Sequence, residues 1–147
     1  MTPYYTGKNH EKHFVDTSAW YALVDADDSD HEAAVAFHTG NSIPLVTTNA
    51  LFSETLTLIR NRISIDAAIT FGQMLKTSSF IRIVTVTPAD EEHAWSIFSR
   101  YRDQDFSFTD CTSFAVMKRM KIDTAFTFDH HFSVMKLIVV PYPLTTR

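Results

Sequence analysis

Short apolar segments of strand length alternate with longer helical patterns along most of this chain, and this alternation limits the folds it can adopt. Strands are expected at residues 13–16, 43–47, 80–86, 124–128 and 137–140. Helices are expected at residues 18–26, 30–39, 49–61, 64–77, 89–102 and 109–121. Strands that alternate with helices pair in parallel and are covered on both faces. We therefore predict an α/β fold with a central, mostly parallel sheet of about five strands.

The composition fits a single globular domain. The chain has 147 residues, of which 45% are hydrophobic and 20% are charged, so it can bury a core. We expect a flexible leader at residues 1–12 and one domain at residues 13–147. The lone cysteine, Cys111, cannot form an internal disulfide, and no segment is apolar over the length that spans a membrane. These features predict a soluble cytoplasmic protein.

Two carboxylates stand where predicted strands end. Asp16 follows the apolar run 13–15, and Asp129 follows the run 125–128. Ligands of open α/β sheets bind at the carboxyl ends of the strands, near the point where the strand order reverses. This placement predicts that Asp16 and Asp129 belong to one functional site.

Two further carboxylates lie inside helical patterns, at positions that otherwise carry apolar residues. Glu54 follows Leu51 by three residues and precedes Leu58 by four, which predicts that it shares their face. Asp110 is followed by Phe114 at the same spacing. A carboxylate on a core-facing stripe is unfavourable unless it is paired or bound to a metal. Glu54 has no Lys or Arg at helical spacing, so metal binding is the favoured explanation.

Together, Asp16, Glu54, Asp110 and Asp129 predict a metal site. Converging carboxylates repel one another, and a divalent cation neutralises that repulsion. Hard oxygen ligands suit Mg²⁺ or Mn²⁺, which polarise a phosphodiester and lower the pKa of a bound water. We therefore interpret the four acids as catalytic residues and metal ligands of a phosphodiesterase, specifically a small ribonuclease.

Each acid also has a purely structural explanation. Asp16 could cap the first helix, and Asp129 could cap the segment that follows it. Asp110 could complement the dipole of a first helical turn. Glu54 could face water if the helix has another register. The metal site is favoured because one explanation then accounts for all four positions.

Several neighbours of the acids are candidates for supporting roles. Thr17 or Ser18 is predicted to orient a metal-bound water or to fix Asp16, and Asp105 is a reserve ligand. His130 and His131 could touch a substrate phosphate or simply face solvent. Cys111, beside Asp110, is more typical of a buried helix residue than of a nucleophile, since no partner histidine is discernible.

The aromatic and basic residues give weaker signals. The pair Trp95 and Phe98 fits a core-facing helical stripe, which we favour over base stacking. Basic groups at residues 60–62, 100–102 and 118–121 are typical of solvated helix ends. The net charge of −4 argues against a protein that holds nucleic acid by bulk electrostatics, but it allows a nuclease whose acids share one cleft.

The chain resembles the PIN-domain nucleases, and most closely the toxins of VapBC toxin–antitoxin systems. The resemblance runs in order from about residue 13 to residue 141, and four short motifs carry it: Phe14-Val-Asp16-Thr-Ser-Ala, Thr47-Thr-Asn followed by Glu54, Ser107-Phe-Thr-Asp110, and Thr127-Phe-Asp129 followed by Phe132. It implies an α/β/α sandwich and a Mg²⁺- or Mn²⁺-dependent endoribonuclease that acts on RNA such as tRNA or rRNA. It also implies a homodimer and an antitoxin partner. In this resemblance Asp16, Glu54, Asp110 and Asp129 are the acidic quartet, with Thr17 or Ser18 as the associated hydroxyl.

Two other classes of function remain as alternatives. A non-catalytic RNA- or protein-binding module of the same fold is disfavoured by the intact quartet. A phospho-acceptor signalling domain also gathers acids at strand ends, but it needs a paired acid on the first strand and a lysine after the last. Here Asp16 stands alone and Pro141 follows the last strand, so this class ranks third.

Overall fold

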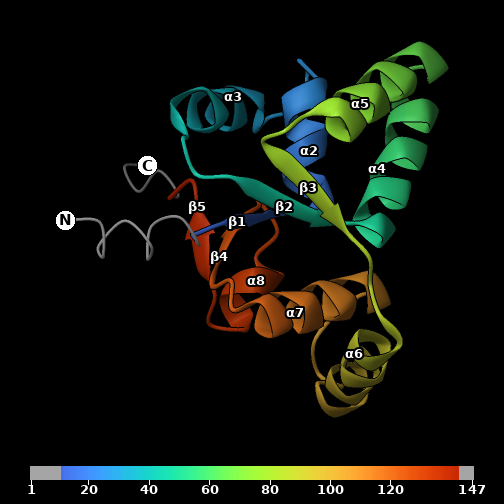
Figure 1. The fold of residues 1–147 in the computed structure, drawn as a ribbon, viewed down its shortest axis with the longest axis vertical. Coiled ribbons are helices and arrows are strands. Elements are labelled where there is room, and N and C mark those ends of the chain that lie inside the picture. The colour runs from blue at the N-terminus through green and yellow to red at the C-terminus, as the bar shows by residue number, and fades with distance from the viewer. Residues whose placement is uncertain (1–10, 143–147) are drawn as a thin grey trace.

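A five-stranded parallel sheet organises the protein, whose computed structural model describes residues 11–142 (Figure 1). Its strands are β1 His13–Val15, β2 Leu45–Thr48, β3 Ile81–Val84, β4 Thr124–Phe126 and β5 Ile138–Val140. They lie in the order β3-β2-β1-β4-β5, and every neighbouring pair is parallel. The predicted fold class is therefore confirmed. Most of the predicted leader (residues 1–10) and the last five residues of the predicted domain (143–147) lie outside the described residues.

Helices fill the connections between the strands. They are α2 Thr17–Val24, α3 His31–Gly40, α4 Asn49–Arg62, α5 Ile65–Thr77, α6 Pro88–Arg100, α7 Phe108–Met120 and α8 His131–Val134. The six predicted helices are present with ends shifted by one or two residues, whereas the single turn of α8 was not predicted. None of the helices within residues 11–142 is both long and apolar enough to cross a membrane.

Alternating strand side chains divide the core into two layers. Phe14 and Val46 pack on one face of the sheet with residues of α6, α7 and α8. Val15, Leu45 and Phe126 pack on the other face with residues of α2, α3, α4 and α5. Figure 1 shows these two helical layers on opposite sides of the strands. The arrangement is an α/β/α sandwich, and both faces of its sheet are apolar, as a covered parallel sheet requires.

The strand order creates a reversal next to β1. The chain builds outward from β1 to β2 and β3, and then returns so that β4 pairs with the other side of β1. The carboxyl ends of β1 and β4 therefore lie side by side at the point where the order reverses. Asp16 follows β1 directly, and Asp129 comes three residues after β4.

A half-buried ion pair joins helices α6 and α7. Arg119 donates from Nε to Asp90 Oδ1 at 2.9 Å and from a terminal nitrogen to Oδ2 at 2.8 Å. Asp90 is 3% exposed and also accepts a hydrogen bond from the Thr87 backbone N–H in the capping box that starts α6. Arg119 lowers the pKa of Asp90, because the guanidinium stabilises the ionised carboxylate. Arg119 thus has a structural partner, unlike the solvated basic residue that the sequence predicted.

Arg119→Gln should lower the free energy of unfolding at pH 7 by about 1–2 kcal/mol, because it leaves the Asp90 carboxylate without its cation. The expected loss is below that of a fully buried pair since Arg119 is 42% exposed. The depressed pKa makes the contribution present above the usual Asp range and lost as the pH falls through the folded pKa. Urea unfolding should show a large difference in the free energy of unfolding between Arg119→Gln and the wild type at pH 7, and a small difference at pH 3. Lys118→Gln, at an exposed neighbouring position, is the control, and equal stability of Arg119→Gln and wild type at pH 7 would refute the role.

Candidate metal centre

Asp16 is a buried carboxylate at the carboxyl end of β1. It is 5% exposed, and its Oδ1 accepts hydrogen bonds from the Ser18 hydroxyl at 2.8 Å and the Ala19 backbone N–H at 3.4 Å. It is therefore the N-cap of α2, as the structural alternative expected. Capping leaves Asp16 at the edge of the sheet where β1 and β4 end, so the cap and a metal ligand are compatible roles.

Two hydroxyl groups connect the ends of β1 and β4. Ser18 Oγ accepts a hydrogen bond from the Phe128 backbone N–H at 2.9 Å and lies 3.2 Å from Thr127 Oγ1. Thr127 Oγ1 in turn accepts from the Asp129 backbone N–H at 2.9 Å. Thr127 belongs to one of the four sequence motifs, and the structure shows that its hydroxyl group connects the two strand ends. These bonds fix the backbone of Asp129 relative to Asp16.

Asp110 reaches the same place from the opposite layer of helices. Its backbone N–H and its Oδ2 form a capping box with Ser107 at 2.9 and 3.0 Å, which starts α7. Its Oδ2 also lies 3.0 Å from Nδ1 of His131. The same nitrogen is 3.1 Å from Oδ1 of Asp129. One imidazole therefore bridges Asp110 and Asp129.

The acids influence one another electrostatically. Burial, together with the negative charge of Asp129, raises the pKa of Asp16 to about 7 against the opposing hydrogen bonds from Ser18 and Thr127. Burial also raises the pKa of Asp110, again with a contribution from Asp129. Asp129 thus perturbs both of the other carboxyl groups. Clustered acids with raised pKa values are typical of functional sites.

Glu54 stands at the margin of this cluster. Its prediction as a core-facing residue was wrong, because it is exposed and the buried stripe of α4 consists of Leu51, Thr55 and Ile59. Its Oε1 nevertheless accepts a hydrogen bond from the Thr17 hydroxyl at 2.6 Å, next to Asp16 in the chain. The Thr55 hydroxyl donates to the same Thr17 oxygen at 3.0 Å. Glu54 is therefore attached to the cluster through a hydroxyl group, on its solvent side.

The two adjacent histidines differ in environment. His130 is 81% exposed, whereas the side chain of His131 is 13% exposed and contacts both Asp110 and Asp129. The sequence could not separate them, because the single turn of α8 that directs His131 inward has too few residues to produce a periodic pattern. The sequence predicted that His131 touches a substrate phosphate or faces solvent. In the structure it instead contacts the carboxylates of Asp110 and Asp129.

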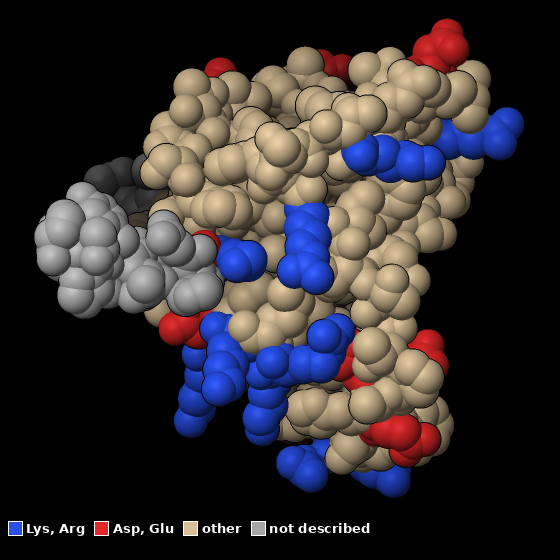
Figure 2. Space-filling view, in the orientation of Figure 1, with Lys and Arg blue, Asp and Glu red and all other residues tan. Residues whose placement is uncertain are grey.

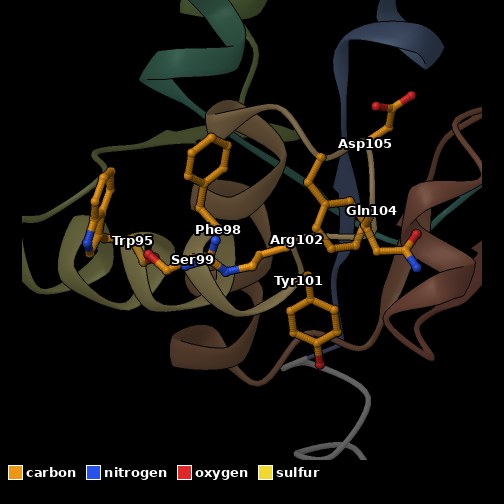
Figure 3. Close-up of a pocket in the computed structure, with 8 residues that line it drawn as sticks. Trp95, Phe98, Ser99, Tyr101, Arg102, Gln104 and Asp105 are labelled. Carbon is orange, nitrogen blue, oxygen red and sulfur yellow. The ribbon is translucent and has the colours of Figure 1, made fainter.

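Asp105 lies in a different environment from Asp16, Asp110 and Asp129. No hydrogen bond or ion pair of the described residues joins it to them; it lines an open hollow of about 420 Å³ beside α6. In Figure 3 its carboxylate points away from the other labelled residues. Trp95 and Phe98 line the same hollow and are exposed, Trp95 by 61%, so the prediction that they pack in the core was wrong. They pack instead against each other and against the exposed Phe108.

Cys111 is fully buried, as predicted for a helix residue of the core. Burial raises the pKa of its thiol to about 11, and the charge of Asp110 contributes. A thiol with this pKa remains protonated near neutral pH and is a poor nucleophile.

The donor set fits Mg²⁺ or Mn²⁺. Asp16, Asp110 and Asp129 offer hard oxygens, and a cation would lower the raised pKa values of Asp16 and Asp110 toward normal. Among the described residues, the group of three ligand atoms that lie within 4.8 Å of one another comes from Asp129, His130 and His131. Two imidazoles would suit a softer metal. The carboxylate set is favoured because Nδ1 of His131 already faces Asp110 and Asp129.

Asp16→Asn should stabilise the metal-free protein in a pH-dependent way. The folded pKa of Asp16 is about 7 against an ordinary value of 3.8, so its contribution to stability is full below pH 3.8 and is lost as the pH rises to 7. Asn stays neutral and retains the oxygen that accepts from Ser18. Urea unfolding in EDTA should show little difference at pH 4 and a gain of about 2–4 kcal/mol at pH 8. A gain that does not change with pH would contradict the raised pKa, and Asp27→Asn, in an exposed turn, serves as the control.

Comparisons with known proteins agree with this geometry. Residues 13–137 match the family described as "PIN domain". The 23S rRNA-specific endonuclease VapC20 of Mycobacterium tuberculosis is 36% identical over 127 residues, which cover 86% of this chain and 96% of that protein. Ribonuclease VapC26 of the same species is 27% identical over 125 residues, covering 84% and 92%.

Solved structures give the same result. The crystal structure of VapC20, described as a sarcin–ricin loop cleaving toxin, matches with a TM-score of 0.81 at 35% identity, over 85% of this chain and 95% of that one. The structure of FitAcB from Neisseria gonorrhoeae matches with a TM-score of 0.64 at 15% identity, over 86% and 94%, and shows the fold alone. The chain therefore belongs to the PIN-domain family and is a homologue of the VapC-type ribonuclease toxins.

Proposed function

We propose that this protein is a Mg²⁺- or Mn²⁺-dependent endoribonuclease that cleaves phosphodiester bonds in structured RNA. One observation carries the proposal: Asp16, Asp110 and Asp129 converge from separate elements at the strand-order reversal, and burial with mutual repulsion raises the pKa of two of them. The relatives VapC20 and VapC26 are named as an endonuclease and a ribonuclease, which supports RNA cleavage as the reaction.

The acids have separable roles in this proposal. Asp16, Asp110 and Asp129 hold the cation from the protein side, and Glu54 completes the set from the solvent side through its contact with Thr17. When bound, the divalent cation stabilises charge on the phosphodiester and lowers the pKa of a coordinated water. Ser18 keeps the Asp16 carboxylate in place, and Asp105 is set aside as a ligand because it lines the neighbouring hollow.

We propose ribosomal RNA as the substrate class, with tRNA as the alternative to be tested beside it. VapC20, which carries rRNA in its name, shares 36% identity with this chain over most of both proteins. The net charge of −4 is no obstacle, because Lys and Arg side chains gather over the lower part of the face shown in Figure 2. Such a local basic surface can contact phosphates while the acids bind the metal.

We also propose an antitoxin partner and a homodimer for this protein. The family resemblance implies both, and exposed apolar side chains offer surface for protein contacts. Helix α5 exposes Ile65, Ile69 and Met74 beside a groove that it forms with α4. An antitoxin that covers a metal-dependent nuclease would keep it inactive until RNA cleavage is required.

Asp110→Asn should abolish metal-dependent RNA cleavage while the protein stays folded, because the amide can still accept the Ser107 N–H but is a poor metal ligand. The assay uses rRNA and tRNA fragments with Mg²⁺, with Mn²⁺ and with EDTA. Cleavage by the wild type should require metal and should fall by more than about 100-fold in the variant, beyond the effect of a supporting residue.

Asp103→Asn, at an exposed position before α7, is the matched control and should cleave like the wild type. Calorimetry of metal binding separates the failures. Metal binding without cleavage of any fragment would favour the non-catalytic binding module, whereas absence of metal binding would refute the metal centre itself.

A further inference from the structure

His131 is mostly buried, although its neighbour in the chain, His130, is exposed to solvent. It opens the single turn of α8, two residues after Asp129, and its side chain is 13% exposed. Its backbone N–H donates to Asp129 Oδ1 at 3.0 Å. Its ring therefore enters the acidic cluster from a backbone position that is hydrogen-bonded to Asp129.

The two nitrogens of the His131 ring meet opposite environments. Nδ1 has two carboxylate oxygens within hydrogen-bond distance, Asp110 Oδ2 at 3.0 Å and Asp129 Oδ1 at 3.1 Å. Nε2 is buried and has no hydrogen-bond partner among residues 11–142. The ring of Phe106 packs against the imidazole at nearly right angles, with centroids 5.2 Å apart. A hydrogen on Nδ1, shared between the two carboxylates, is the tautomer that satisfies this environment.

This contact addresses a physical problem of the site. Burial raises the pKa of Asp110 and the like charge of Asp129 adds to it, so a hydrogen-bond donor placed between the two carboxylates offsets their repulsion. Asp110 comes from α7 and Asp129 from the segment after β4, so no shared backbone element holds the two carboxylates at a fixed separation.

We propose that His131 is a positioning residue that holds the carboxylates of Asp110 and Asp129 together through Nδ1–H, so that both oxygens are in place before a divalent cation arrives. The inference rests on the proposed metal-dependent function. A ligand pair that is already ordered loses less conformational freedom on binding, which raises metal affinity. The role differs from that of a metal ligand, because the hydrogen on Nδ1 blocks the lone pair that a ligand would need.

Three variants separate the possible roles of His131. His131→Phe keeps a ring that packs against Phe106 but removes the donor. His131→Asn returns an N–H donor near the position of Nδ1. His130→Phe, at the exposed neighbour, is the matched control.

The measurement is calorimetric titration of each purified protein with Mg²⁺ and with Co²⁺, after thermal unfolding has shown that each variant is folded. His131→Phe should weaken the binding of both ions by about 10–100-fold, as loss of a supporting partner does. His131→Asn should recover most of that loss, and His130→Phe should bind as the wild type does.

Four results would overturn the proposal. Unchanged binding by His131→Phe would show that the two acids need no bridge. A loss confined to Co²⁺, which accepts imidazole more readily than Mg²⁺ does, would make His131 a direct ligand. Failure of a folded His131→Asn to recover binding would exclude the donor. If the wild type itself binds neither ion, the proposed metal-dependent function fails, and the proposal about His131, which rests on it, is overturned with it.

Discussion

Repulsion among carboxylates at one edge of a parallel sheet is the constraint on which the rest of this structure depends. The reversal of strand order beside β1 brings Asp16 and Asp129 to adjacent strand ends, and α7 adds Asp110 from the other layer. Burial, with a contribution from the charge of Asp129, raises the pKa of Asp16 to about 7, so the carboxylate form of this group is unfavourable in the cluster. The proposed cation would relieve this cost in stability at neutral pH.

The same carboxylates that form the cluster also start helices. Asp16 caps α2, Asp110 belongs to the capping box of α7, and Asp129 accepts the N–H of the first residue of α8. Each cap fixes the rotation of its carboxylate, so the helix ends position the ligands that the sheet brings together. Capping and the proposed metal binding, which are alternatives when each acid is considered alone, are therefore compatible with one geometry.

The sequence predicted the fold well because its patterns are local. Strand segments and helical stripes identified all five strands and the six longer helices, and the acids at strand ends followed from the sheet topology. Features that depend on tertiary contacts were missed. The inward turn of His131 requires α8, which is too short to produce a pattern. Glu54 sits one position away from the buried stripe of its helix, and the exposure of Trp95 depends on how α6 packs on α7.

The most direct test of the metal centre is diffraction from crystals grown with Mn²⁺, measured at a wavelength where manganese scatters anomalously. The account predicts an anomalous peak within about 2–2.5 Å of carboxylate oxygens from Asp16, Asp110 and Asp129. A peak held only by Asp129 and the two histidines would contradict the carboxylate centre. A crystal in which Mn²⁺ binds at the protein surface but gives no peak at the end of β1 would contradict it as well.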